Sequence, residues 1–229
     1  MKKKKIFIAC DSSKVSQVKK IISSTKNLKI KIGYKFGLEF FCSMHGRKFI
    51  SKLKRKEIFL DLKLNDIPNT CVSAIKALRD LKNISYLTVH ISGGIEMLKA
   101  VKKEAKKTNK KLKILGVSVL TSFSNSTIKK IGFSKSVKDI VKKQAKLAKS
   151  AKLDGIVCSG HEVKLLKKIC NKMEIFTPGI RLKGDKAGDQ KRIMSPKEAF
   201  ANGATSIVIG RSVTKGNIKN NIQKLIKSL

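Results

Sequence analysis

Short apolar runs that alternate with lysine-rich helical segments constrain the fold of this chain more than any other feature. Eight runs rich in β-branched residues recur, and each precedes a segment whose apolar residues have helical spacing. The predicted strands cover residues 5–10, 28–34, 57–62, 86–91, 113–120, 155–158, 174–176 and 206–209. The predicted helices cover residues 14–24, 38–52, 69–81, 94–107, 137–149, 162–170, 196–201 and 215–228.

Strict alternation of strand and helix predicts a parallel sheet. Eight such units in 229 residues favour a closed (β/α)₈ barrel, the TIM barrel, over an open doubly wound sheet. No linker or low-complexity segment divides the chain, so we expect a single domain spanning residues 1–229. No Gly-x-Gly-x-x-Gly motif follows the first predicted strand, which argues against a dinucleotide-binding fold.

The cysteines and the apolar runs indicate the cellular compartment of such a chain. Its five cysteines are scattered without a Cys-x-x-Cys pair, which argues against a disulfide scaffold or a zinc site and favours a reducing cytoplasm. No stretch approaches the roughly 20 apolar residues that span a bilayer. The apolar run before Asp11 is also shorter than the core of a signal peptide, which has about 7–15 residues.

The formal net charge of +38 is extreme, and most of the basic residues are lysines. Arginine is the better bidentate ligand for phosphates and bases, and the lysines are spread over nearly every predicted helix. We therefore do not expect specific nucleic-acid binding, although a basic nucleic-acid-binding protein on a barrel scaffold remains an alternative. The charge should still attract an anionic substrate at low salt.

The stretch Asp61-Leu-Lys-Leu-Asn-Asp-Ile-Pro-Asn-Thr70 follows a buried apolar run. Side chains alternate along a strand, so Asp61 and Lys63 should lie on one face, with Asp66 and Thr70 beyond the strand end. Such charges persist without water only when they are paired or when function requires them. A salt bridge at the rim of a strand is the alternative interpretation.

In a β/α barrel the reactive groups lie at the carboxyl ends of the strands. Acidic residues and lysines gather at the early strand ends, whereas glycine and arginine gather at the last two. The segment Gly210-Arg211 after the final strand predicts a phosphate site, because glycine allows close approach to the backbone and arginine binds phosphate bidentately. An ordinary turn with a surface arginine is the alternative.

Histidines do not form a ligand pattern in this sequence. His90 lies on an apolar strand and is more simply a hydrogen-bonded core residue than a general acid. His45 and His161 show no ligand spacing with it, so we expect no metal site.

The sequence resembles the orotidine 5′-phosphate decarboxylase family in its short bacterial form, over essentially the whole chain. The residues that carry the resemblance are Ala9-Cys-Asp11, Lys35-Phe-Gly, Asp61 to Thr70, Thr88-Val-His90, Leu120-Thr-Ser122, Pro178-Gly-Ile-Arg181, Asp189-Gln190 and Ile209-Gly-Arg211. The resemblance implies conversion of orotidine 5′-monophosphate to UMP and CO₂ without a metal or organic cofactor.

The same resemblance implies roles for individual residues. A charged tetrad would comprise Lys35, Asp61, Lys63 and Asp66, with Lys63 as the proton donor. The enzyme would be a homodimer in which Asp66 and Thr70 reach into the partner subunit's site. The other implied substrate-binding residues are Asp11 and Lys35 at the ribose, Thr121 at the pyrimidine with Ser122 and Pro178 nearby, and Arg181, Gln190, Gly210 and Arg211 at the phosphate.

A barrel enzyme acting on sugar phosphates is the closest alternative. Such decarboxylases and synthases share the Asp-x-Lys-x-x-Asp motif, but the resemblance to them would imply metal-dependent enolate chemistry. A Glu would then be expected at the position of Lys35. Lys35 and the Ile67-Pro68 pair favour the nucleotide enzyme, and a magnesium requirement would reverse that interpretation.

Overall fold

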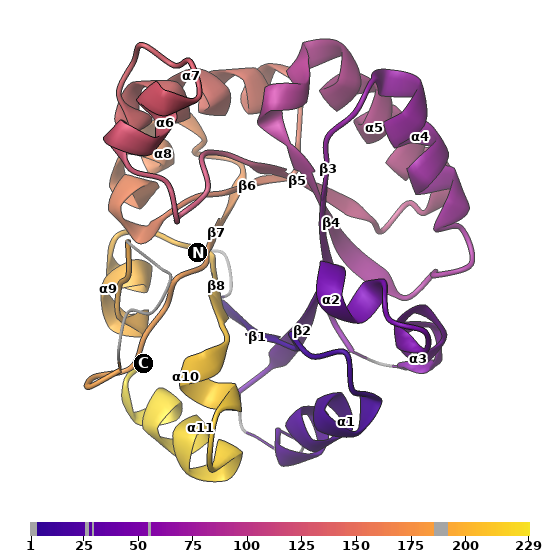
Figure 1. Cartoon of the computed structure of the whole chain (residues 1–229), viewed down its shortest axis with the longest axis vertical. Helices are drawn as coiled ribbons and strands as arrows, with labels where there is room; N and C mark the ends of the chain where they lie inside the picture. Colours follow the sequence, from indigo (N-terminus) through magenta and orange to yellow (C-terminus); the bar gives the residue numbers. More distant parts are fainter. Residues whose placement is uncertain (1–3, 26–27, 29, 55, 186–191) are drawn as a thin grey trace.

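The computed structural model describes residues 4–25, 28, 30–54, 56–185 and 192–229, and within them eight parallel strands close into a barrel in sequence order (Figure 1). The strands are β1 (Lys5–Ala9), β2 (Ile32–Gly37), β3 (Ile58–Leu64), β4 (Ile84–His90), β5 (Lys113–Val117), β6 (Gly155–Val157), β7 (Glu174–Thr177) and β8 (Ser206–Ile209). This topology confirms the predicted TIM barrel, since β1 pairs with both β2 and β8.

Helices surround the ring of strands (Figure 1). They are α1 (Val15–Ser24), α2 (Leu38–Phe41), α3 (Gly46–Lys52), α4 (Pro68–Ala77), α5 (Gly94–Thr108), α6 (Asn125–Lys130), α7 (Val137–Ser150), α8 (Val163–Ile169), α9 (Pro196–Ala201), α10 (Arg211–Thr214) and α11 (Ile218–Lys227). None of the helices in the described ranges is both long and apolar enough to cross a membrane.

The boundaries of β2 and β5 differ most from the sequence prediction. The second strand begins at Ile32 and continues to Gly37, so Lys35 lies inside the strand rather than just after it. The fifth ends at Val117, which leaves residues 118–120 outside the sheet. Apolar composition predicted both strands, but it did not locate their ends, because these depend on pairing with strands far along the chain.

The predicted helix over 38–52 is two short helices, α2 and α3, separated by a turn. A Cβ atom on Gly46 would lie 1.7 Å from the carbonyl oxygen of Phe40, so this close approach requires glycine. The structure also adds α6 and α10, which the sequence analysis missed because four to six residues are too few to establish a helical period.

An aromatic cluster fills the interior of the barrel. The rings of Phe7, Phe59, Tyr86 and Phe176 pack together, mostly edge to face, with centroids 4.9–6.2 Å apart. Gly33 leaves room for them, since a Cβ there would lie 2.4 Å from the Phe7 ring. We call the end of the barrel at the carboxyl ends of the strands the barrel mouth. The aromatic cluster forms a closed apolar floor beneath it.

Polar side chains close the opposite end of the barrel. The Lys5 ammonium donates to the Tyr86 hydroxyl at 2.6 Å, and this hydroxyl donates to Glu174 Oε2 at 3.0 Å. Lys5 also pairs with Glu57, and Lys113 pairs with Glu174. These side chains at the amino-terminal end are thus paired with one another, which limits the cost of their burial.

Candidate active site

Four charged side chains meet at the barrel mouth over β1, β2 and β3. Lys35 Nζ lies 2.9 Å from Asp11 Oδ1 and 3.4 Å from Asp61 Oδ2. Lys63 Nζ lies 2.8 Å from the same Asp61 oxygen. The strand register brings these residues together, since Ala9 pairs with Lys35 and Gly37 pairs with Asp61. The result is a row of alternating charges in the order Asp11, Lys35, Asp61, Lys63.

The two central members of this row are largely buried, with side-chain exposures of 11% for Lys35 and 13% for Asp61. Burial alone would lower the pKa of Lys35, but Asp61 and Asp11 outweigh it and raise the pKa above its ordinary value. Burial opposes ionisation of Asp61 as well, yet Lys35 and Lys63 hold its pKa below the ordinary value. Both groups are therefore charged at neutral pH.

Lys63 occupies a bulge in β3. Its φ of 50° lies in the left-handed region, which is strained for a residue with a side chain, and the β3–β4 register shifts between Leu60 and Leu64. Asp61 and Lys63 meet as expected, although the backbone between them departs from regular strand alternation.

Thr88 on β4 supports the bulge. Its hydroxyl oxygen accepts a hydrogen bond from the Lys63 backbone N–H at 2.9 Å, and the hydroxyl donates to Asp61 Oδ1 at 3.0 Å. The sequence analysis did not assign Thr88 to the site. The available signals were its place in the Thr88-Val-His90 segment and on a predicted strand, but the pairing register was needed to identify its partners.

Asp66 and Thr70 lie beyond the end of β3 and are exposed in the single chain. Asp66 Oδ1 accepts a hydrogen bond from the backbone N–H of Ile67 at 2.7 Å. Within the described residues Asp66 forms no ion pair in the single chain, so one chain alone brings together only Lys35, Asp61 and Lys63 of the predicted tetrad.

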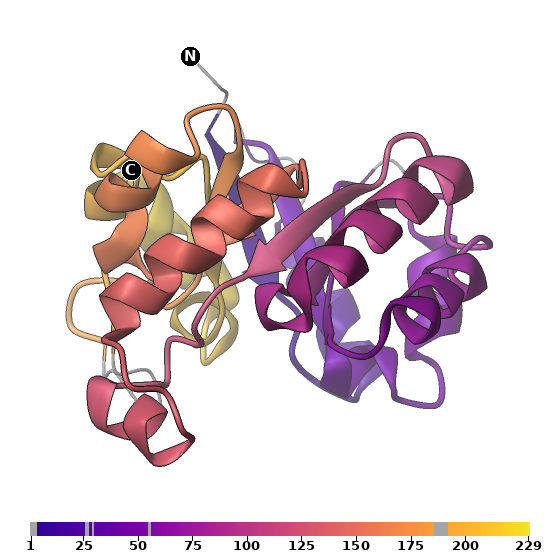
Figure 2. The ribbon, with the colours of Figure 1, turned by 90° about the horizontal axis from the view of Figure 1, so that it is seen from above.

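The other predicted substrate-binding residues follow β5, β7 and β8, at the same end of the barrel. Thr121 and Ser122 lie between β5 and α6, and Figure 2 shows α6 beyond the carboxyl end of β5. The segment after β7 contains Pro178 and the buried Arg181, whose guanidinium donates to the carbonyl of Ile180 at 3.0 Å.

Gly210 connects β8 to α10, which begins at the exposed Arg211. The predicted phosphate ligand Gln190 and its neighbour Asp189 lie outside the described residues.

His90 ends β4 near Lys63 and is half-buried, and burial together with Lys63 lowers its pKa. Within the described ranges, His, Cys, Asp and Glu form no group of three that could hold a metal ion. All five cysteines are described and free, and Cys10 and Cys158 are buried in the core.

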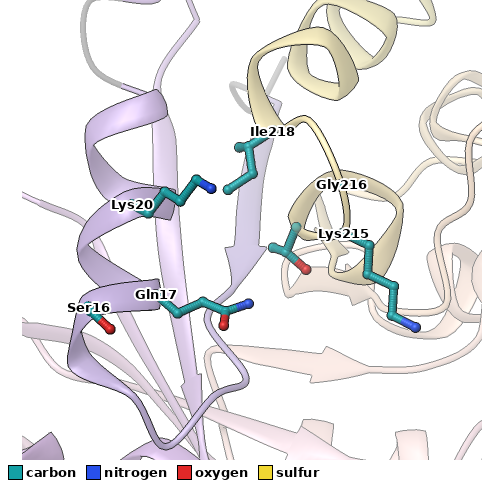
Figure 3. A pocket seen from close by; sticks show the side chains of 7 residues that line it. Ser16, Gln17, Lys20, Lys215, Gly216 and Ile218 are labelled. Atoms are coloured by element: carbon teal, nitrogen blue, oxygen red, sulfur yellow. The ribbon is translucent and has the colours of Figure 1, made fainter.

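A polar cavity of about 520 Å³ lies outside the barrel, between α1 and the turn that joins α10 to α11. Figure 3 shows Lys20 and Ile218 pointing toward one another across it, with Gln17 and Lys215 nearby. None of the charged residues at the mouth lines this cavity, so it is separate from the candidate site.

A closed β/α barrel with paired carboxylates and lysines at its strand ends defines an enzyme of the TIM-barrel class. The particular family follows from comparison with known proteins. The model of the Orotidine 5′-phosphate decarboxylase / HUMPS family matches residues 4–224, and the chain belongs to this family.

Curated relatives match over nearly their whole length. A protein named orotidine 5′-phosphate decarboxylase from Wolbachia sp. subsp. Brugia malayi is 44% identical, covering 98% of each chain. A protein of the same name from Buchnera aphidicola subsp. Acyrthosiphon pisum is 43% identical, covering 98% of this chain and 95% of its own.

Solved structures agree with the sequence comparison. The orotidine 5′-phosphate decarboxylase from Lactobacillus acidophilus superposes with a TM-score of 0.83 at 31% identity, covering 98% of each chain. An orotidine 5′-monophosphate decarboxylase from Methanocaldococcus jannaschii, crystallised with the inhibitor BMP, gives a TM-score of 0.78 at 25% identity over 99% of each chain.

Proposed function

We propose that the charged row at the barrel mouth carries out the decarboxylation of orotidine 5′-monophosphate, with Lys63 as the proton donor. The overall activity, which yields UMP and carbon dioxide, follows from the family and from the named relatives. The observation that carries the residue assignment is the 2.8 Å contact between Lys63 Nζ and Asp61 Oδ2 at the strand ends.

The chemistry needs a fixed cation and an available proton. When the bond from the pyrimidine ring to the carboxylate breaks, carbon dioxide leaves and the electron pair stays on the ring carbon as a localised carbanion. The Lys63 ammonium stabilises this charge and then transfers a proton to the same carbon. Asp61 holds the ammonium in position, and Lys35 holds Asp61 from its other side.

Other residues at the mouth are proposed to bind the substrate. Asp11 and Lys35 bind the ribose hydroxyls, and Thr121, Ser122 and Pro178 lie along the pyrimidine. The phosphate is held by Arg181, Gln190, Gly210 and Arg211. Binding energy at the phosphate, which is remote from the reacting carbon, can be used to position the ring for decarboxylation.

The site is proposed to be completed by a second copy of the chain. Asp66 and Thr70 are exposed, and Ile67 between them is 67% exposed. In the segment between β2 and α3, Leu38 is 55% exposed and Met44 is 91% exposed. Apolar side chains left exposed at the rim of a site are typical of a protein interface. A homodimer would cover them and bring Asp66 and Thr70 to the partner's mouth.

We also infer that residues 1–229 form one catalytic domain, which the closure of the barrel by its first and last strands supports. The free thiols support a reducing compartment, and we propose the cytoplasm. We propose no cofactor and no specific nucleic-acid partner.

The test is incubation of purified protein with orotidine 5′-monophosphate in EDTA, following the loss of substrate absorbance. We expect full turnover, because the proposed chemistry uses only side chains of the protein. An absolute requirement for magnesium would instead support the metal-dependent chemistry of the sugar-phosphate enzymes.

A further inference from the structure

Arg192 connects three loops of the barrel mouth. Its guanidinium Nη1 donates to Oε1 of Glu162, which lies in the loop between β6 and α8. Nη2 donates to the carbonyl of Leu120 at 2.9 Å and lies 3.4 Å from the carbonyl oxygen of Val119. The ion pair is largely buried, with side-chain exposures of 15% for Arg192 and 8% for Glu162.

The backbone near Arg192 is fixed relative to β7. The N–H of Met194 donates to the carbonyl of Gly179 at 3.2 Å, and the N–H of Arg181 donates to the carbonyl of Met194 at 3.0 Å. Met194 also packs on the loop after β6, since a Cβ on Gly160 would lie 2.6 Å from its sulfur. Arg192 is therefore held beside the segment that contains Arg181.

The carbonyl acceptors lie directly before two predicted substrate-binding residues. β5 ends at Val117, so Val119 and Leu120 have left the sheet, and Thr121 and Ser122 follow at once. A backbone segment outside the sheet lacks the strand hydrogen bonds that would fix its position. The hydrogen bonds from Arg192 to the carbonyls of Val119 and Leu120 take the place of these strand hydrogen bonds.

We propose that Arg192 is a positioning residue, which sets the Thr121–Ser122 segment relative to the Arg181 segment while Glu162 orients its guanidinium. This inference rests on the proposed function, since it concerns the residues that hold the pyrimidine and the phosphate of one substrate. Arg192 itself makes no proposed contact with the substrate.

The geometry of the guanidinium suits this role. Its planar fork donates to a carboxylate and to carbonyls in different directions at once, whereas a lysine ammonium is a compact point charge. Replacing Arg192 with lysine therefore retains the charge opposite Glu162 but loses the fixed contacts with Val119 and Leu120. This separates positioning from simple neutralisation of a buried carboxylate.

The experiment compares kcat and KM for orotidine 5′-monophosphate, Kd for UMP, and Tm in Arg192→Lys and the wild type. We expect kcat/KM to fall about ten-fold or more and UMP to bind more weakly, as expected for loss of a charge-assisted hydrogen bond, with Tm little changed. Wild-type kcat/KM in Arg192→Lys would overturn the proposal.

Arg47→Lys is the matched control. Arg47 likewise donates to a carbonyl, that of Ala77 at 2.7 Å, and pairs with Asp80, but these partners lie at the far end of α4 from the mouth. We expect its kcat/KM to stay near the wild-type value. An equal loss in the control would assign the effect to arginine replacement in general and would overturn the proposal.

Glu162→Gln provides a second test, which decides the matter if Arg192→Lys does not fold. Removing the carboxylate charge should loosen the guanidinium and lower kcat/KM, and the double variant should lose little more than Arg192→Lys alone. Wild-type kinetics in Glu162→Gln, or fully additive losses, would overturn the proposal. An inactive wild type would refute the proposed function instead.

Discussion

At the scale of single residues, the site is defined by Asp61, whose carboxylate forms salt bridges with two lysines. Its Oδ2 atom pairs with both Lys35 and Lys63, while Oδ1 accepts a hydrogen bond from the Thr88 hydroxyl. Removing either lysine would leave the buried Asp61 carboxylate in a row whose charges no longer balance. The residues therefore act as a unit, and single substitutions should have large effects.

Replacing Lys63 with alanine should abolish turnover while leaving the fold intact. The proposed proton donor is lost, and general acid catalysis alone contributes about 10²–10⁴-fold to rate. Turnover is measured by loss of substrate absorbance and folding by circular dichroism, with Lys224→Ala on the exposed face of α11 as the control. Substantial residual decarboxylation in Lys63→Ala would refute the assignment.

The depressed pKa of Asp61 predicts a pH dependence of stability. A carboxylate whose pKa is lowered in the folded state stabilises the protein above the unfolded value of about 3.9, and that contribution is lost as the pH falls through the folded value. We expect Asp61→Asn to be less stable than the wild type at pH 7, and the difference to shrink below about pH 4. Urea unfolding at several pH values measures it, and a difference independent of pH would contradict the prediction.

At the scale of elements, the bulge in β3 depends on a single side chain of β4. Thr88 is fully buried and hydrogen-bonds both the Lys63 backbone and the Asp61 carboxylate. The neighbouring strand thus holds Lys63 in a strained conformation that β3 alone would not favour.

Replacing Thr88 with valine, which has nearly the same shape, tests this dependence. An unsatisfied buried N–H at Lys63 should cost about 1–3 kcal/mol of stability, and kcat should fall because the ammonium loses its fixed position. Thr25→Val is the control, since Thr25 is also buried and hydrogen-bonded to the Ile21 and Ile22 carbonyls, but at the end of α1. Equal kcat in the two variants would show that the bulge does not position Lys63.

At the scale of the whole molecule, the proposed dimer predicts complementation between two inactive variants. Mixing unfolded Lys63→Ala and Asp66→Ala chains and refolding them together should form mixed dimers with one intact site, restoring about a quarter of the wild-type sites. Activity and molar mass by light scattering measure this. No recovery from a demonstrated mixed dimer would show that Asp66 does not act across subunits.

The net charge of +38 predicts strong dependence of kcat/KM on salt. The substrate is an anion, so electrostatic attraction should raise the association rate at low ionic strength and be screened as the Debye length falls from about 30 Å at 0.01 M to about 10 Å at 0.1 M. We expect kcat/KM to fall with added KCl while kcat changes little. A kcat/KM independent of salt would show that the lysines do not steer the substrate.

The sequence alone determined the barrel and the charged residues of its mouth. Strand and helix periods are local properties, so eight alternating units could be read directly, and parallel strands necessarily place Asp11, Asp61 and Lys63 at one end. Gly210 and Arg211 were assigned to the phosphate from their place after the last strand. The roles of the other residues proposed for the pyrimidine and the phosphate came from the resemblance to the family.

Only the tertiary structure decided how these residues meet. The position of Lys35 inside β2, the bulge at Lys63 and the role of Thr88 all depend on the register between strands that lie far apart in sequence. The contacts of Arg192 with Glu162 and Leu120 join three separate loops. Pairing between residues so far apart in the sequence is set by the packing of the closed barrel and not by any local pattern. These contacts could therefore not be predicted from the sequence alone.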